Sequence, residues 1–125
     1  RTARSVNDGK PGKVIEQIEQ AVAGIDKPVI CLLGLAYKEN VDDFRESPSV
    51  TVADRLIENG IGTVIVVEPF MKAGKAGKAY TLVPLEEGIA QADIVVLLTA
   101  HDAFRKMDMT LLSGKKVIDT RGIFS

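Results

Sequence analysis

The sequence has little of several features that mark common classes of protein. Its single cysteine rules out an internal disulfide framework and so favours a reducing compartment such as the cytoplasm. No apolar run approaches the ~18 residues of a membrane span, and no charged-then-apolar leader opens the chain. Sixteen basic residues against seventeen acidic ones leave a formal charge of −1, so no overall field attracts nucleic acid or an acidic membrane surface. A phosphate site must therefore be local.

Side chains suited to catalysis are also scarce. Cys31 sits in the apolar run Val29–Leu33, where it is interpreted as a small buried hydrophobe rather than a reactive thiol. His101 is the only histidine, so acid–base catalysis has to be considered. No serine or cysteine nucleophile is indicated beside it, and a role for His101 and Asp102 at the start of a helix before Phe104 is favoured. We therefore predict no catalytic residue in this chain.

One long polar loop follows the first apolar run. Val29–Leu33 has the length and composition of a buried strand and ends at Gly34, and Ser47-Pro48 has the N-cap and first-turn residues of a helix start. Loops outside the carboxyl ends of strands are where open α/β sheets bind ligands. Between the two signals lie Tyr37, Lys38, Asp42, Asp43, Arg45 and Glu46.

This loop does not have the glycines of a dinucleotide-binding turn. The pattern G-x-G-x-x-G would need glycine at Ala36 and Glu39, and only Gly34 is present. A cation at Lys38 beside the ring of Tyr37 suits an anionic ligand with a flat ring, although a surface loop with ordinary salt bridges stays open as an alternative. The carboxylates suit hard cations, but no EF-hand pattern or His/Cys ligand set accompanies them, so we predict no metal site.

The pattern along the chain predicts a three-layer α/β/α Rossmann-like parallel sheet of about five or six strands, with its first strand central. An amphipathic helix is expected from Pro11 and another between Ser47 and a left-handed cap at Asn59-Gly60. A short helix is expected to begin at Pro84. The predicted strands are 29–33, 64–67, 79–83, 94–98 and 116–119.

Charged residues outside the polar loop each leave two interpretations. Glu68 ends the second predicted strand, where a dinucleotide fold holds a ribose hydroxyl, but without the glycines a solvated strand end or a salt bridge with a nearby lysine is favoured. Lys72, Lys75 and Lys78 could attract phosphate, yet a solvated face is the preferred interpretation.

The stretch GLAYKENVDDFRESPS, residues 34–49, resembles the signature of the UDP-glucose/GDP-mannose dehydrogenase family, in its C-terminal UDP-sugar-binding domain. Further similar segments extend the resemblance over essentially the whole chain. Within the family it looks most like the UDP-N-acetyl-D-mannosamine dehydrogenases, with the UDP-glucose 6-dehydrogenases as the nearest alternative. The further segments are RSVNDGKP at 4–11, VVEP at 66–69, ADIVV at 92–96 and VIDTRG at 117–122.

The resemblance implies a function and a set of site residues. The family oxidises the C6 alcohol of a UDP-sugar to a carboxylate with NAD, through a thiohemiacetal on a cysteine whose position Cys31 does not match. Positions that match the family's ligand contacts are Tyr37 and Lys38 for the nucleotide and phosphates, and Arg121 for the nucleotide side. Arg45 matches a contact to the NAD pyrophosphate. The chain alone is therefore expected to bind UDP-sugar without turning it over.

The same resemblance implies how the chain is organised. Residues 11–125 are expected to form the UDP-sugar-binding domain, and residues 1–10 a weakly ordered end of a central helix or linker. The chain opens with Arg1 rather than Met, which favours a piece of a longer enzyme. Its implied partners are an N-terminal NAD-binding domain, which would hold most of the NAD, and a second subunit joined through the central helix. A free-standing nucleotide-binding or regulatory module and, more weakly, a true NAD-binding domain remain alternatives.

Overall fold

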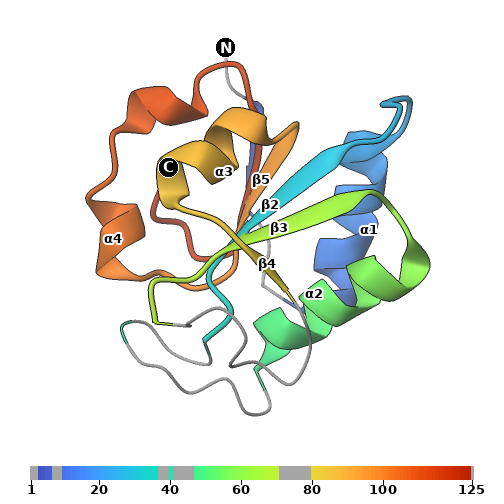
Figure 1. Ribbon diagram of the computed structural model, residues 1–125, viewed down its shortest axis with the longest axis horizontal. Helices are drawn as coiled ribbons and strands as arrows, with labels where there is room; N and C mark the ends of the chain where they lie inside the picture. The colour runs from blue at the N-terminus through green and yellow to red at the C-terminus, as the bar shows by residue number, and fades with distance from the viewer. Residues whose placement is uncertain (1–2, 7–9, 37–39, 41–46, 71–79, 125) are drawn as a thin grey trace.

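A six-stranded parallel sheet with helices on both faces forms the body of the protein (Figure 1). The computed structural model describes residues 3–6, 10–36, 40, 47–70 and 80–124. Within these ranges the strand order is β1-β6-β5-β2-β3-β4, and every neighbouring pair is parallel. The strands are β1 (Ala3–Val6), β2 (Val29–Leu33), β3 (Thr63–Val67), β4 (Thr81–Leu82), β5 (Ile94–Leu97) and β6 (Lys116–Asp119). The predicted three-layer parallel sheet is confirmed, with β2 at its centre.

The two long helices cover one face of the sheet, and the shorter ones cover the other (Figure 1). α1 (Pro11–Val22) and α2 (Pro48–Asn59) pack against each other and against the sheet. α3 (Leu85–Gln91), α4 (Asp102–Arg105) and the 3₁₀ helix η1 (Met109–Leu112) follow on the opposite side.

Both ends of α2 are fixed by capping residues that can be recognised in the sequence. Ser47 lies in extended backbone as the N-cap, and its Oγ accepts a hydrogen bond from the N–H of Ser49 at 3.2 Å. Gly60 closes the helix in the left-handed region, with φ of 61°. Because the caps define where α2 begins, they also define where the polar loop after β2 ends.

The central strand divides its side chains between two hydrophobic cores. Ile30 and Leu32 pack with the helices α1 and α2, whereas Cys31 and Leu33 pack with α3 and its neighbours. All four side chains are fully buried, and each large apolar side chain contributes about 1.5–3 kcal/mol when it leaves water. Covering on both faces explains why the strand reads as an unbroken apolar run rather than an alternating one.

The N-terminal segment corrects one expectation. We expected residues 1–10 to be a weakly ordered helix end or linker, but Ala3–Val6 forms β1 and pairs in parallel with β6, from Ala3 opposite Lys116 to Val6 opposite Asp119. Its hydrogen bonds are made by the backbone, so a short segment without clear apolar periodicity can still close the edge of a sheet. The assignment of residues 11–125 as the binding domain stays a prediction.

The chain reverses its direction of travel along the sheet between β2 and β5. From β2 it passes through α2 to β3 and β4 on one side, and from β5 it passes through α4 to β6 on the other. The carboxyl ends of two such neighbouring strands form the crevice in which open α/β sheets bind ligands. A ligand site is therefore expected at the loops that follow β2, β3, β5 and β6.

Candidate functional site

The turn after β2 is packed directly against the turn after β5. Gly34 has φ of 94°, and a Cβ placed on it would lie 2.5 Å from the Cβ of Thr99. The hydroxyl of Thr99 in turn donates to the carbonyl oxygen of Ala36 at 2.9 Å. Glycine at position 34 is thus required for the close approach of two strand ends, as well as for its left-handed backbone.

A buried carboxylate occupies the N–H groups that follow Gly34. Glu68, at the end of β3, is 6% exposed. Its Oε1 accepts hydrogen bonds from the N–H of Leu35 at 2.8 Å and from the N–H of Ala36 at 3.1 Å. Its Oε2 accepts from the N–H of Phe70 at 3.0 Å. The preferred interpretation of Glu68 as a solvated strand end is wrong, because the side chain is buried and accepts hydrogen bonds from backbone N–H groups, and no lysine among the described residues pairs with it.

The charge of Glu68 is stabilised by these donors. Burial by itself raises the pKa of the carboxyl group, but the hydrogen bonds from His101, Leu35 and Phe70, together with the charge of His101 when it is protonated, outweigh burial and lower the pKa below its ordinary value. Glu68 is therefore ionised at neutral pH, and it supplies a fixed negative charge under the turn where a dinucleotide fold would receive a pyrophosphate.

His101 joins this network from the turn after β5. Its fully buried side chain places Nε2 2.9 Å from Glu68 Oε1, and its Nδ1 accepts a hydrogen bond from the N–H of Asn40 at 2.7 Å. The predicted position at the start of a helix is confirmed, since His101 is the residue before α4, but its side chain makes no cap hydrogen bond. The ring bonds two other loops instead.

A second turn, after β6, is shaped by another buried carboxylate. Asp119 is 1% exposed, and its Oδ1 accepts from the N–H groups of Arg121 at 2.9 Å and Gly122 at 2.7 Å. Its Oδ2 accepts from the N–H of Phe124 at 2.8 Å. The exposed side chain of Arg121 is steadied by a hydrogen bond from Nε to the carbonyl oxygen of Leu98 at 3.1 Å. Within the described ranges its terminal guanidinium nitrogens make no hydrogen bond.

Arg121 borders a cavity of about 270 Å³, slightly smaller than the ~300–1,000 Å³ of typical small-molecule sites. The starts of α1 and α2 both reach this cavity, and Lys10, the N-cap residue of α1, adds a second cation. Helix N-termini carry partial positive charge that adds to that of Lys10 and Arg121. The walls are formed by Lys10, Pro11, Pro48, Ser49, Val52, Leu98, Thr120 and Arg121. The arrangement is suited to an anion.

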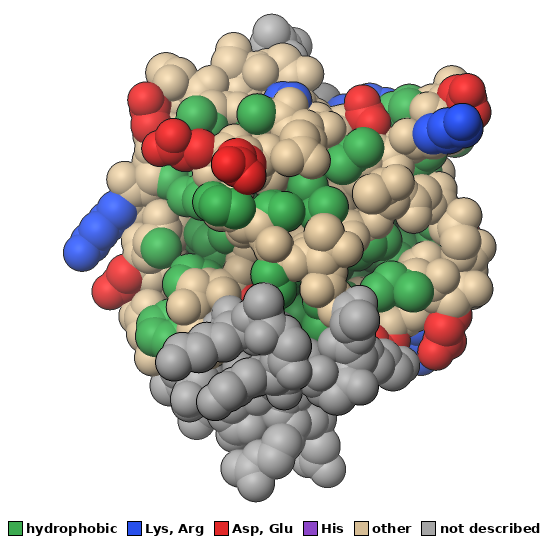
Figure 2. Space-filling model, in the orientation of Figure 1, with side chains coloured by type: hydrophobic (Ala, Val, Ile, Leu, Met, Phe, Trp, Pro, Cys, Tyr) green, Lys and Arg blue, Asp and Glu red, His purple; other side chains and the backbone are tan. Residues whose placement is uncertain are grey.

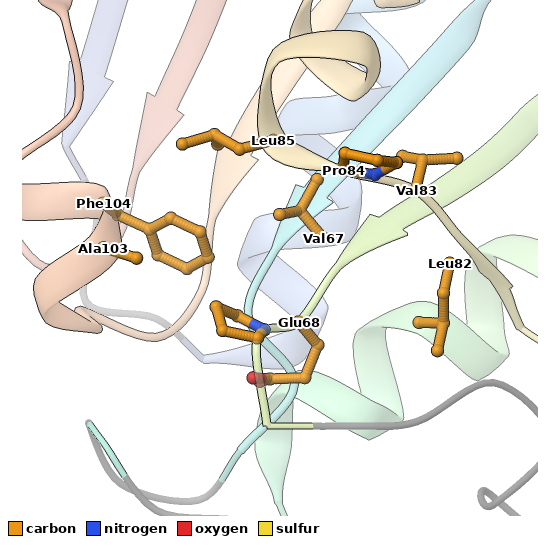
Figure 3. A pocket seen from close by; sticks show the side chains of 9 residues that line it. Val67, Glu68, Leu82, Val83, Pro84, Leu85, Ala103 and Phe104 are labelled. Atoms are coloured by element: carbon orange, nitrogen blue, oxygen red, sulfur yellow. The ribbon is translucent and has the colours of Figure 1, made fainter.

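A larger hollow of about 420 Å³ lies at the other side of the sheet edge, between the ends of β3 and β4 and the helix α4 (Figure 3). It opens on the face where hydrophobic side chains gather in Figure 2. Val67, Leu85 and the ring of Phe104 line it, and its single charged side chain among the described residues is Glu68. None of the described residues that line this hollow is a cation, and Glu68 is negatively charged, so these residues do not favour a phosphate.

The predicted site residues fall into two groups. Arg121 is placed at the carboxyl edge of the sheet, beside the cationic cavity. Tyr37, Lys38 and Arg45 lie outside the described residues, as do the carboxylates of the polar loop and the lysines of 71–78. The roles of these residues stay predictions.

Sequence reasoning missed Lys10, Asp119 and the depth at which Glu68 and His101 are buried. Lys10 was assigned to the linker because it precedes the apolar pattern that starts at Pro11. The motif Asp119-Thr-Arg121-Gly122 did contain a signal, because aspartate often accepts from backbone N–H groups two and three residues ahead of it.

The described residues include no activated nucleophile. Burial raises the pKa of the Cys31 thiol to about 12, so it is protonated and shielded at neutral pH. No described group of three or more His, Cys, Asp or Glu side chains is placed to hold a metal ion. None of the described helices has the length and apolar character needed to cross a membrane. The arrangement can bind and orient an anionic ligand.

Comparison with known proteins agrees with this geometry. Residues 31–125 match the UDP binding domain of the UDP-glucose/GDP-mannose dehydrogenase family. The chain is 44% identical to the NDP-N-acetyl-D-galactosaminuronic acid dehydrogenase of Ralstonia nicotianae, over 100% of this chain and 30% of the relative. It is 38% identical to the UDP-N-acetyl-D-mannosamine dehydrogenase of Salmonella typhi, over 99% of this chain and 32% of the relative.

A solved structure extends the likeness to three dimensions. A UDP-glucose dehydrogenase from the archaeon Pyrobaculum islandicum is 31% identical, with a TM-score of 0.78, over 91% of this chain and 26% of that one. The chain spans about 30% of the length of the curated relatives it matches.

Proposed function

Because the chain belongs to the UDP-glucose/GDP-mannose dehydrogenase family, as its motifs predicted, we propose that it is the UDP-sugar-binding domain of an NAD-dependent UDP-sugar 6-dehydrogenase. The observation that carries the proposal is the cationic cavity beside Arg121, which lies at the edge of the sheet where such folds bind nucleotides. The complete enzyme would oxidise the C6 alcohol of the sugar to a carboxylate.

The diphosphate of UDP is assigned to the cationic cavity. Arg121 lines the cavity and is held there by the hydrogen bond from its Nε, and a guanidinium can match phosphate oxygens in a bidentate way through its terminal nitrogens. Lys10 and the two helix starts that line the same cavity add positive charge. Lys38 is assigned to the same phosphates as a point charge, and Tyr37 to the nucleotide.

The described residues do not fit NAD at the turn after β2. A bound pyrophosphate would need the N–H groups of Leu35 and Ala36, and Glu68 holds both of them with a negative charge. This observation argues against the alternative that the chain is itself an NAD-binding domain. We assign NAD mainly to an N-terminal domain outside this chain, with Arg45 reaching its pyrophosphate from this side.

The chain alone is expected to bind UDP and to leave the sugar unoxidised. Oxidation to the acid through a thiohemiacetal needs an accessible thiolate, and Cys31 is a buried thiol. We assign the reactive cysteine to the rest of the enzyme, which we propose to be a cytoplasmic homodimer joined through a central helix. An amino sugar, as in the names of the two curated relatives, is the proposed substrate, with UDP-glucose as the alternative.

Calorimetry with UDP and, separately, NAD tests the assignment. We expect UDP to bind the chain with a Kd of about 10–1,000 μM, because part of the site is missing, and NAD to bind much more weakly. Arg121→Ala or Lys38→Ala should each cost about 1.5–3 kcal/mol of binding, the scale of a hydrogen bond to a charged group. Arg55→Ala, an exposed position on α2, is the matched control and should leave the affinity unchanged. Tight NAD binding by the chain alone would reject the proposal. An unchanged UDP affinity in Arg121→Ala would also reject it.

A further inference from the structure

Arg121, a cation of the cavity that we assign to the diphosphate, lies in a turn built around the side chain of Asp119. The turn follows β6, and Asp119 is the last residue of that strand. Its Oδ1 accepts hydrogen bonds from the N–H of Arg121 at 2.9 Å and from the N–H of Gly122 at 2.7 Å. One buried oxygen therefore fixes the backbone from which the side chain of Arg121 extends.

The other oxygen of Asp119 fixes the far end of the turn. Oδ2 accepts from the N–H of Phe124 at 2.8 Å, and both side chains are buried, with 1% and 4% of their surface exposed. Phe124 packs in the hydrophobic core on the α3 side of the sheet. Between the two bonds, Gly122 has φ of 73°, which glycine adopts without strain. The carboxylate thus holds residues 121–124 against a packed core.

The side chain of Arg121 is fixed by the end of the neighbouring strand, β5. Its Nε donates to the carbonyl oxygen of Leu98 at 3.1 Å. Beside it, the hydroxyl of Thr120 donates to the carbonyl oxygen of Leu97 at 2.7 Å. Ser49, in the first turn of α2, donates to the same oxygen of Leu98 at 3.5 Å. These bonds join the turn after β6, the end of β5 and the start of α2 at the wall of the cavity.

The arrangement keeps the charge of the guanidinium apart from the charge of the carboxylate. Both oxygens of Asp119 are occupied by backbone N–H groups, and no carboxylate among the described residues forms an ion pair with Arg121. A carboxylate that bound the guanidinium directly would compete with a phosphate for the same donors. Because the backbone satisfies Asp119, the terminal nitrogens of Arg121 stay available at the cavity.

We propose that Asp119 is a positioning residue for the phosphate site, because it holds the turn that carries the guanidinium of Arg121 to the cavity. The inference rests on the proposed function and adds to that site a residue that touches no ligand. A hydrogen bond from a guanidinium to a phosphate needs a distance of about 2.7–2.9 Å, so a displacement of about 1 Å breaks it. Without the bonds to Asp119, the backbone at Arg121 is free to make such a displacement.

Two substitutions at position 119 separate the charge of the side chain from its hydrogen bonds. Asp119→Asn keeps an oxygen that can accept from the N–H groups of Arg121 and Gly122, and turns its NH₂ group toward the N–H of Phe124. Asp119→Ala removes every acceptor. We expect Asp119→Ala to raise the Kd for UDP about tenfold, the scale of one displaced hydrogen bond to a charged group, and Asp119→Asn to bind within about threefold of the wild type. Both are expected to lower the free energy of unfolding.

Val117→Ala is the matched control for lost stability. Val117 is buried on the same strand, but its side chain packs in the core on the α3 side, whereas Val52 and Leu98 at the cavity belong to the other core. We expect Val117→Ala to lower stability and to leave the Kd for UDP within about twofold of the wild type.

The measurements are the UDP Kd by NMR titration and the free energy of unfolding in urea for each variant of the 125-residue chain. A merely structural role predicts that affinity follows stability in all three variants, whereas the proposal predicts that it follows the acceptor for the N–H of Arg121. An unchanged affinity in Asp119→Ala would overturn the proposal. So would a loss in Asp119→Asn or Val117→Ala as large as the loss in Asp119→Ala.

A double substitution tests whether Asp119 acts through Arg121. In an Arg121→Ala background the guanidinium is gone, so adding Asp119→Ala should change the Kd for UDP by less than about twofold, although it costs about tenfold in the wild-type background. Equal losses in the two backgrounds would show that Asp119 reaches the site by another route, and they would overturn the proposal.

A measurement without ligand separates this inference from the proposed function. The amides of Arg121 and Gly122 should be protected from hydrogen exchange in the wild type and exchange faster in Asp119→Ala. Unprotected amides in the wild type would remove the anchor, whatever the chain binds. If Asp119→Ala does not fold, this result and the affinity of Asp119→Asn still decide. Failure of the wild type to bind UDP, with both amides protected, would overturn the proposed function and with it the role of Asp119 toward the nucleotide.

Discussion

Replacing Glu68 by glutamine tests whether a buried charge organises the ligand-binding edge. The carboxylate accepts hydrogen bonds from three backbone N–H groups and from the Nε2 of His101. Glu68→Gln preserves the shape of the side chain but removes its charge and turns one oxygen into an NH₂ donor. That donor must face either the N–H of Phe70 or the cluster of donors at Oε1.

The expected loss of stability follows from these contacts. If the amide oxygen remains on the three-donor side, the N–H of Phe70 loses its acceptor, which costs about 1–3 kcal/mol for a partly buried donor. The remaining bonds lose their charge assistance, which makes them roughly half as strong. We therefore expect Glu68→Gln to lower the free energy of unfolding by about 2–4 kcal/mol at pH 7.

Urea unfolding at a series of pH values measures this contribution. The folded-state pKa of Glu68 lies below the ordinary value of 4.5, so the fold favours the ionised form. The resulting stabilisation is fully present above pH 4.5 and is lost as the pH falls through the folded-state pKa. The difference between the wild type and Glu68→Gln should therefore shrink in acid. Glu19→Gln, on the exposed face of α1, is the control and should change stability by less than about 0.5 kcal/mol.

Two results would refute this reasoning. A Glu68→Gln variant as stable as the wild type at pH 7 would mean that the charge is not held by the backbone donors. A stability difference that persists unchanged below the folded-state pKa would mean that the variant suffers from packing rather than from loss of ionisation.

Gly34→Ala should destabilise the chain by about 2–4 kcal/mol in urea unfolding, since it combines left-handed backbone with a clash against Thr99, whereas Gly12→Ala, with open space in α1, should be neutral or stabilising. An unaffected Gly34→Ala would contradict the close approach of the two turns. Cys31 should resist a thiol reagent at pH 8 until urea unfolds the chain, because its pKa is raised to about 12; labelling of the folded state would contradict its burial. Ser47→Ala should lower the unfolding free energy by about 1–3 kcal/mol, because it removes both the α2 cap and the buried hydrogen bond that Ser47 donates to the carbonyl oxygen of Leu35; an unchanged stability would contradict these contacts.

The sequence was sufficient for the class of fold because its strongest signals are local or periodic. The unbroken run Val29–Leu33 indicates a strand buried on both faces, and Ser47-Pro48 and Gly60 mark the ends of α2 by their own backbone chemistry. The motif at 34–49 was enough to predict the family. Strand β1 escaped notice because its pairing with β6 uses backbone groups that every residue has.

For the candidate site, the sequence predicted the roles of some residues, and the tertiary structure was needed for others. Residue types alone indicated that Arg121 is a cation in a loop after a strand, and that Cys31 is unreactive. Only the tertiary structure decided what Glu68 and His101 do, since their partners lie 33 and 61 residues away along the chain. In the sequence, a carboxylate at the end of a strand gives the same signal whether it is solvated, binds a ribose or accepts hydrogen bonds from two backbone N–H groups. Its role was decided by which turns the parallel sheet brings to the same edge.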